Sequence, residues 1–114
     1  MPFVHVISNI GLSDAEKSNC LQTLSQAIAE LLDKSEGAVM TSWTTSKMTM
    51  AGKETHTAFI ELRAIRLPSE ASERLSVELC ERMTLITGIQ ADRIYINFVD
   101  IHPANWGWNK KTFG

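Results

Sequence analysis

The chain shows the same order of sequence patterns twice, and this repetition constrains its fold more than any other feature. In each half, two short runs rich in β-branched and aromatic residues flank an amphipathic stretch with helical spacing. A shift of 56 residues, from 13 to 69, superposes Ser13-Asp14-Ala15 on Ser69-Glu70-Ala71, and Phe3-Val4 on Phe59-Ile60. The repeated β-α-β order predicts an α+β fold in which two such units form one four-stranded mixed sheet with two helices on one face.

The expected elements follow from this periodicity and from the residues that end each stretch. Ser13 and Glu16 have the spacing of a capping box, which predicts the start of a first helix that closes near Gly37. A second helix is expected from about Ser69 to Thr87, with Gly88 at its end. Strands are expected over residues 3–7, 38–44, 57–65 and 93–99, and a polar loop over 46–55.

Length and charge narrow the class of protein. A chain of 114 residues suits one domain over residues 1–114. The 11 basic and 13 acidic residues give a formal charge of −2 with no basic block, so nucleic acid is not expected as a partner. No apolar run approaches the roughly 20 residues of a membrane span, and no basic segment with an apolar signal core opens the chain. We therefore expect a cytoplasmic protein that does not bind a membrane.

Cys20 and Cys80 are isolated in their segments. Neither belongs to a C-x-x-C motif, and no histidine lies near them at the spacing of a metal site. Both fall in the expected helices, which favours buried thiols over a metal site or a redox pair. We accordingly expect no metal.

Two helices can cover only one face of the expected sheet. Ile65 and the alternating residues of the fourth strand leave apolar side chains for the opposite face. Self-association is the simplest way to cover that face.

Met1-Pro2 places a proline directly before the first expected strand. A proline is tolerated as the first residue of a strand, because its missing N–H would face the chain end rather than the neighbouring strand. Alternatively, Met1 is removed, as is usual when the second residue is small, and Pro2 becomes the N-terminus. Its nitrogen would then be a secondary amine, whereas retained Met1 would leave an amide without a basic lone pair.

The C-terminal stretch contains short pieces that identify a family. With the length, the initial Met1-Pro2 and the duplicated β-α-β order, they resemble the macrophage migration inhibitory factor family, in the tautomerase superfamily. The resemblance covers the whole chain, strongly at both ends and weakly between. The matching C-terminal pieces are Asp92-Arg93, Tyr95-Ile96-Asn97, Asp100, Ala104-Asn105, Gly107-Trp108-Asn109 and Thr112-Phe113.

The resemblance implies a homotrimer with a central barrel-like core and an active site at each subunit interface. It makes Pro2 the catalytic base and matches Lys34 to a pocket lysine that would bind a carboxylate and keep the amine neutral. From the residues alone, Lys34 could instead be a solvated charge near a helix C-terminus. No cofactor is implied.

The other pocket positions also follow from the resemblance. Ile65 matches an apolar wall, and Tyr95 and Asn97 match residues that the adjacent subunit supplies. Trp108 and Phe113 match aromatic side chains of the pocket. Without the resemblance, Ile65 could be a core residue, Asn97 a polar residue of an edge strand, and the two aromatics core or interface residues.

Two departures from the family pattern bear on the expected activity, the first on substrate choice and the second on thiol redox chemistry. Trp106 occupies a position where the family commonly has a smaller aliphatic residue, so the pocket mouth is expected to be narrower or differently shaped. Some members carry a C-x-x-C motif where this chain reads Thr57-Ala58-Phe59-Ile60, so thiol redox activity is not expected. Arg63 and Arg66 are expected to be solvated, although either could help to bind a carboxylate if it turned inward.

The resemblance implies a keto–enol tautomerase that acts on small-molecule α-keto acids of the phenylpyruvate type, with Pro2 as general base and then general acid. Two alternatives stay open. One is a cytokine-like signalling protein, released without a signal peptide, that binds a receptor protein. The other is a related decarboxylase or hydratase of small acids that uses the same proline.

Overall fold

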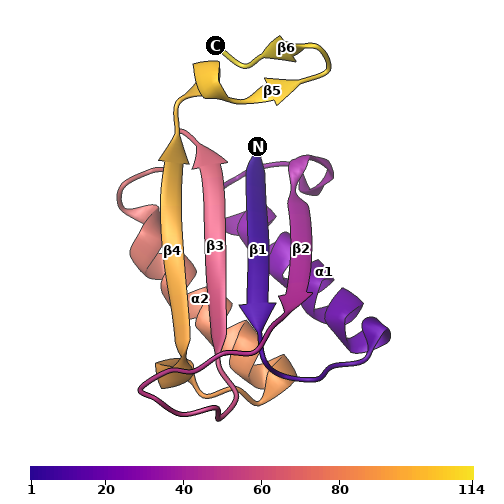
Figure 1. Cartoon of the computed structure of the whole chain (residues 1–114). Coiled ribbons are helices and arrows are strands. Elements are labelled where there is room, and N and C mark those ends of the chain that lie inside the picture. Colours follow the sequence, from indigo (N-terminus) through magenta and orange to yellow (C-terminus); the bar gives the residue numbers. More distant parts are fainter.

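The computed structural model describes residues 1–114, and a four-stranded sheet with two helices behind it forms the body of the molecule (Figure 1). A separate two-stranded hairpin lies beyond one edge of the sheet. The elements, in order, are β1 (Pro2–Ser8), α1 (Asp14–Leu31), β2 (Met40–Thr45), β3 (Ala58–Ile65), α2 (Ala71–Thr87), β4 (Ile94–Ile101), β5 (Gly107–Trp108) and β6 (Lys111–Thr112). Short 3-10 turns cover Glu36–Ala38, Ala91–Arg93 and Pro103–Asn105.

The strand order is β2-β1-β3-β4, which confirms the expected fold. β1 pairs parallel with β2, β3 pairs parallel with β4, and the central pair β1–β3 is antiparallel. The two β-α-β units therefore lie side by side. Because of the antiparallel central pair, the start of β1 and the ends of β3 and β4 share one edge of the sheet, where the hairpin β5–β6 also lies (Figure 1).

The core lies between the sheet and the two helices. In β1 and β3 every second residue is buried, as the pleat requires when one face packs on helices and the other does not. Apolar side chains of α1 and α2 meet them at helical spacing. The largest fully buried side chains are Val4, Val6, Leu24, Ile28, Ile60, Leu62, Leu75, Leu79, Met83 and Ile89.

The capping box of α1 is confirmed, but the expected end near Gly37 is wrong. Ser13 Oγ accepts a hydrogen bond from the Glu16 N–H at 3.1 Å, and Glu16 Oε1 accepts one from the Ser13 N–H at 2.9 Å. The helix ends at Leu31, and Asp33 then turns the chain with a φ of 53°. The apolar periodicity stops at Leu32, since residues 33–36 are polar and exposed. The early end brings segment 34–40 beside the start of β1.

The second helix begins and ends differently from the first. Glu70 occupies its N-cap without a side-chain hydrogen bond, so packing of Leu75, Leu79 and Met83 stabilises the helix more than capping does. Gly88 ends it in the left-handed conformation with a φ of 77°, as expected from the sequence. Neither helix combines the length and the apolar character needed to cross a bilayer.

Arg93 fixes the polar loop between β2 and β3. Its guanidinium donates hydrogen bonds of 3.0–3.2 Å to the backbone carbonyls of Met50, Lys53, Thr55 and His56. A planar guanidinium with several diverging N–H groups suits this role, because it satisfies carbonyls that would otherwise have only water as a partner. The loop lies at the edge of the sheet opposite to the start of β1 (Figure 1).

The face of the sheet away from the helices carries no covering layer in one chain. Its apolar side chains, which include Phe3, Ile7, Phe59, Val99 and Ile101, are only partly buried. This open face, defined as the face that presents Phe3 and Phe59, agrees with the sequence expectation that two helices leave one face uncovered.

The two cysteines differ in burial. Cys20 is fully buried, with its Sγ 3.4 Å from Met83 Sδ, and burial raises the pKa of its thiol to about 11. Cys80 is only partly buried, and burial raises the pKa of its thiol as well. The expectation of a buried thiol is therefore confirmed for Cys20 and only in part for Cys80.

Two leucines of α2 give a matched test of the core. Leu79 has no exposed surface, whereas Leu85 is 86 % exposed. We expect Leu79→Ala to lower the free energy of unfolding by about 2–5 kcal/mol, because it removes buried methyl groups and leaves a cavity. Leu85→Ala should change it by less than about 0.5 kcal/mol. Urea denaturation at one fixed protein concentration measures both, and equal effects would contradict the assigned core.

Candidate functional site

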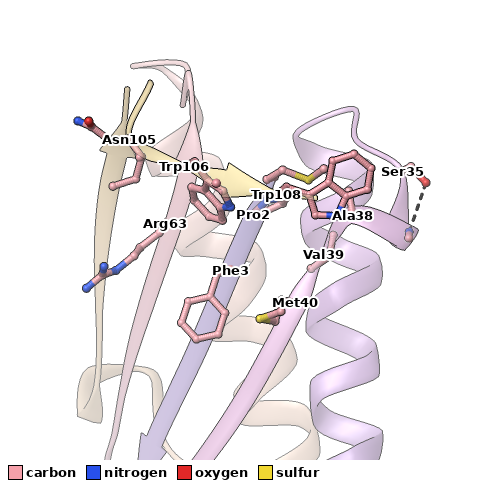
Figure 2. Close-up of a pocket in the computed structure, with 14 residues that line it drawn as sticks. Pro2, Phe3, Ser35, Ala38, Val39, Met40, Arg63, Asn105, Trp106 and Trp108 are labelled. Atoms are coloured by element: carbon pink, nitrogen blue, oxygen red, sulfur yellow. Dashed lines mark hydrogen bonds between the residues drawn. The ribbon is translucent and has the colours of Figure 1, made fainter. Parts of the chain in front are cut away.

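A pocket of about 840 Å³ lies at the edge of the sheet where β1 begins (Figure 2). Four segments line it: residues 1–3, residues 35 and 37–40 after α1, the ends of β3 and β4, and residues 105–108 before and within β5. These segments meet because the antiparallel pair β1–β3 places the N-terminus beside the ends of β3 and β4. Its walls are mainly apolar, which suits a small organic ligand.

Pro2 is the first residue of β1 and lies buried at this pocket. It pairs in register with Ala64, so the sheet holds its position. Its missing N–H costs nothing at the first position of the strand. Met1 is half-buried and also lines the pocket, so the nitrogen of Pro2 lies where a ligand in the pocket would approach it.

The environment of the N-terminus favours a neutral amine. The pKa of the Met1 amine is lowered from its ordinary value of 8.0, first by burial and second by the positive charge of Lys34. Lys34 is exposed and does not line the pocket itself, whereas its neighbour Ser35 does. The ammonium group of Lys34 is therefore near enough to the N-terminus to lower the pKa of its amine, but it lies outside the pocket wall.

Trp106 and Trp108 form the aromatic part of the wall. In Figure 2 their rings lie on either side of Pro2. The ring of Phe113 stacks on that of Trp108, with centroids 6.1 Å apart and planes 11° apart, but Phe113 does not line the pocket. Phe113 therefore supports Trp108 from behind, and the turn between β5 and β6 brings the two rings together.

Three other sequence-predicted residues lie outside this pocket in one chain. Ile65 is buried one residue beyond Ala64. Asp100 of β4 shares a row with Pro2, and Asn97 lies three residues before Asp100. Asn97 is therefore displaced from Pro2 by about 10 Å along the strands and by about 10 Å across two strands. Tyr95 lies farther still and is 64 % exposed. Neither Tyr95 nor Asn97 can reach Pro2 of the same chain.

Several pocket residues are not identified in the sequence analysis. Phe3 and Met40 pair in register on the open face, and Val39 and Ile101 add apolar surface. Strand alternation indicates the face of Phe3, but no sequence pattern shows that residues 38–40 return to its side. Residues 38–40 can lie beside Phe3 only because α1 ends at Leu31.

Arg63 also lines the pocket, whereas its residue type and position predict a solvated side chain. Its side chain is 50 % exposed, and its Nε donates a hydrogen bond of 2.5 Å to Glu61 Oε1. Arg66 is exposed and lies outside this pocket. The expectation of solvation therefore agrees with the position of Arg66 and only in part with that of Arg63.

The fold and the pocket define a class of protein: a duplicated β-α-β protein with an apolar pocket at a buried proline in the second position of the chain. The chain matches the family model "Macrophage migration inhibitory factor (MIF)" over residues 1–114. It is 30 % identical to "Macrophage migration inhibitory factor" of Xenopus tropicalis over 115 residues, which is 99 % of each protein.

Solved structures agree with this match. The homologue from Prochlorococcus marinus is 36 % identical with a TM-score of 0.91, over 98 % of this chain and 99 % of that one. The MIF-like protein from Entamoeba histolytica is 25 % identical with a TM-score of 0.93, over 98 % of each chain. The chain belongs to the macrophage migration inhibitory factor family, within the tautomerase superfamily.

The effect of Lys34 on the N-terminal amine can be tested without a substrate. In protein that retains Met1, we expect Lys34→Ala to raise the pKa of that amine, because it removes a nearby positive charge. The pKa should stay below 8.0, since burial is the larger cause. The pH dependence of acetylation of the N-terminal peptide, followed by mass spectrometry, measures it.

Lys47→Ala is the matched control. Lys47 follows β2 at the opposite edge of the sheet and forms an ion pair with Glu54, so its removal should leave the pKa of the amine unchanged. Equal shifts in the two variants would show that Lys34 acts only through net charge.

Proposed function

We propose that this protein is a keto–enol tautomerase of α-keto acids of the phenylpyruvate type, with Pro2 as the catalytic base after removal of Met1. One observation carries the proposal: Pro2 is buried at an aromatic-walled pocket where burial and Lys34 both lower the pKa of an amine. Membership of the tautomerase superfamily agrees with it.

The chemistry requires a neutral amine. Once Met1 is removed, the nitrogen of Pro2 is a secondary amine, which can accept a proton only in its uncharged form. The amine of Met1, one residue nearer to solvent, already has a lowered pKa, so the same two causes should act on Pro2. Pro2 would take the proton from the enol hydroxyl and deliver it to C3, the carbon between the enol carbon and the ring, which yields the keto acid and restores the free amine.

The pocket residues would orient the substrate. Lys34 would bind the carboxylate, and Trp106 and Trp108 would pack against the ring, with Phe113 behind Trp108. Fixed positions for the carboxylate and the ring hold the reacting carbon near Pro2, and this positioning lowers the barrier. Ile65 would add to the apolar surroundings. No cofactor takes part.

Tyr95 and Asn97 can serve this site only from another subunit, so the proposal includes a homotrimer with the site at the subunit interface. Three features support it. The open face carries partly buried apolar side chains, and Tyr95 and Asn97 project from β4 where they are exposed. The hairpin β5–β6 extends beyond the sheet, where it can contact a neighbour (Figure 1).

The oligomeric state gives a direct test. We expect sedimentation equilibrium at micromolar concentration to give three times the chain mass of 12.7 kDa, because one chain leaves both the open face and the site incomplete. Asn97→Ala should lower kcat/KM at least several-fold without dissociating the trimer. A monomer with full activity would refute both the assembly and the role of Asn97.

The pH dependence of catalysis tests the base. In protein whose intact mass shows that Met1 is absent, kcat/KM for phenylpyruvate should rise with pH through the pKa of the Pro2 amine, since only the neutral form accepts a proton. Lys34→Ala should move this rise to higher pH, because it removes a like charge. It should also raise KM, because it removes the partner of the carboxylate.

Two Pro2 variants complete this test. Pro2→Ala keeps an N-terminal amine, now primary, so some activity should remain with a shifted pH dependence. Pro2→Gly also keeps a primary amine but has no side chain to restrict the backbone that positions it, so it should lose most activity. If Pro2→Ala kept the full rate and an unshifted profile, Pro2 would not be the base.

The names of the curated relatives support a second candidate, an action on cells. The Xenopus tropicalis and Trichuris trichiura proteins are named as a macrophage migration inhibitory factor and a homologue of one. A signalling role would depend on the outer surface rather than on the amine. Pro2→Gly should therefore leave receptor binding largely intact while it abolishes catalysis. Loss of both would contradict a signalling role that is independent of the amine.

A further inference from the structure

Arg63 brings a second cation to the pocket. It lies on β3 directly opposite Phe3, on the open face, at a Cα separation of about 5 Å. Among the residues that line the cavity, Arg63 is the only one with a charged side chain, and no aspartate or glutamate lines it. An apolar pocket that contains a cation and no acid favours an anionic ligand.

Most of the hydrogen-bonding capacity of Arg63 is unused. A guanidinium has five N–H groups, and the only hydrogen bond that this one donates is from Nε to Glu61 Oε1. Nη1 and Nη2 have no hydrogen-bond partner within the chain, and the side chain is half exposed. These two nitrogens present the planar fork that binds a carboxylate through two parallel hydrogen bonds.

Arg63 and Ser35 lie at different ends of the pocket, and Lys34 is next to Ser35 outside the pocket wall. Figure 2 shows the guanidinium of Arg63 on the side away from Ser35, the residue that follows Lys34. Lys34 has no ion-pair partner, and Arg63 has only Glu61. The two tryptophans lie between these ends, where the apolar body of a ligand would pack.

We infer that Arg63 binds a second acidic group at the distal end of the substrate, so that the pocket prefers keto acids with two carboxylates. This inference rests on the proposed function, in which Lys34 binds the carboxylate next to the keto group. Arg63 is thereby a specificity-determining residue and takes no part in proton transfer.

A matched pair of probes tests the inference. Phenylpyruvate and 4-carboxyphenylpyruvate share the ring and the keto acid and differ in the distal carboxylate. The measured quantity is the ratio of kcat/KM for 4-carboxyphenylpyruvate to that for phenylpyruvate. We expect Arg63→Leu to lower this ratio about tenfold or more, the size of a lost charge-assisted hydrogen bond. Arg63→Lys, which keeps the charge and loses the fork, should give an intermediate ratio.

Two further variants separate this role from a general effect on the fold. Arg66→Leu removes a cation near the end of the same strand but outside the pocket, and should leave the ratio unchanged. Glu61→Gln removes the acid that occupies Nε, and should raise the ratio, since Arg63 then loses a competing anion. A purely structural role of Arg63 would not move the ratio upward in Glu61→Gln.

Calorimetric binding of the same two probes distinguishes this inference from the proposed function. If neither probe turns over but 4-carboxyphenylpyruvate binds more tightly and Arg63→Leu abolishes the preference, tautomerase activity is wrong and the role of Arg63 holds. If Arg63→Leu leaves the preference unchanged in both turnover and binding, or Glu61→Gln leaves it unchanged, the role of Arg63 is wrong.

Discussion

The antiparallel pairing of β1 with β3 is the constraint on which the rest of the structure depends. It joins two parallel β-α-β units through their first strands, so the chain start lies at the edge where β3 and β4 end. Only at that edge can the segment after β4 fold over the N-terminus. The pocket is therefore a consequence of the topology, and Pro2 is suited to its place because the first residue of the strand needs no N–H.

The burial that favours a neutral N-terminal amine also lowers the stability of the folded protein in acid. Because the folded protein holds the proton of the N-terminal amine less tightly than the unfolded chain, the unfolded chain binds more protons below the ordinary pKa. The folded state is therefore most stable, as far as this amine is concerned, above the pKa of the amine in the unfolded chain. Its free energy of unfolding declines as the pH falls from that pKa towards the lower pKa of the folded chain. Lys34 acts in the same direction. The N-terminus thus gives up stability in acid for an amine that is uncharged at higher pH.

Most of the fold can be predicted from the sequence because periodicity and capping are local. The capping box of Ser13 and the left-handed Gly88 follow directly from residue type and spacing. The end of α1 could not be predicted as well, because Gly37 is also a plausible helix end and the turn at Asp33 has no glycine. That error conceals part of the site, since residues 38–40 reach the pocket only after the early turn.

The residues of the candidate site likewise fall into those that can be predicted from the sequence and those that cannot. Pro2, Trp106 and Trp108 lie together at the pocket and can be found from the family resemblance. Arg63 could not be assigned from the sequence, since alternation gives its face but not the pocket that the C-terminal segment builds beside it. Tyr95 and Asn97 depend on a second subunit, which the sequence of one chain describes only through an uncovered face.

Polar side chains limit how the open face can be covered. His5, Glu61 and Asn97 lie in one row across β1, β3 and β4, between two largely apolar rows, one with Phe3 beside the charged Arg63 and the other with Phe59. A surface that buries this row must offer hydrogen-bond partners to each of its members, because an unpaired buried polar group costs about 1–3 kcal/mol. A uniform apolar surface cannot do so. The apolar rows therefore favour association, and the polar row restricts it to arrangements in which specific groups face one another.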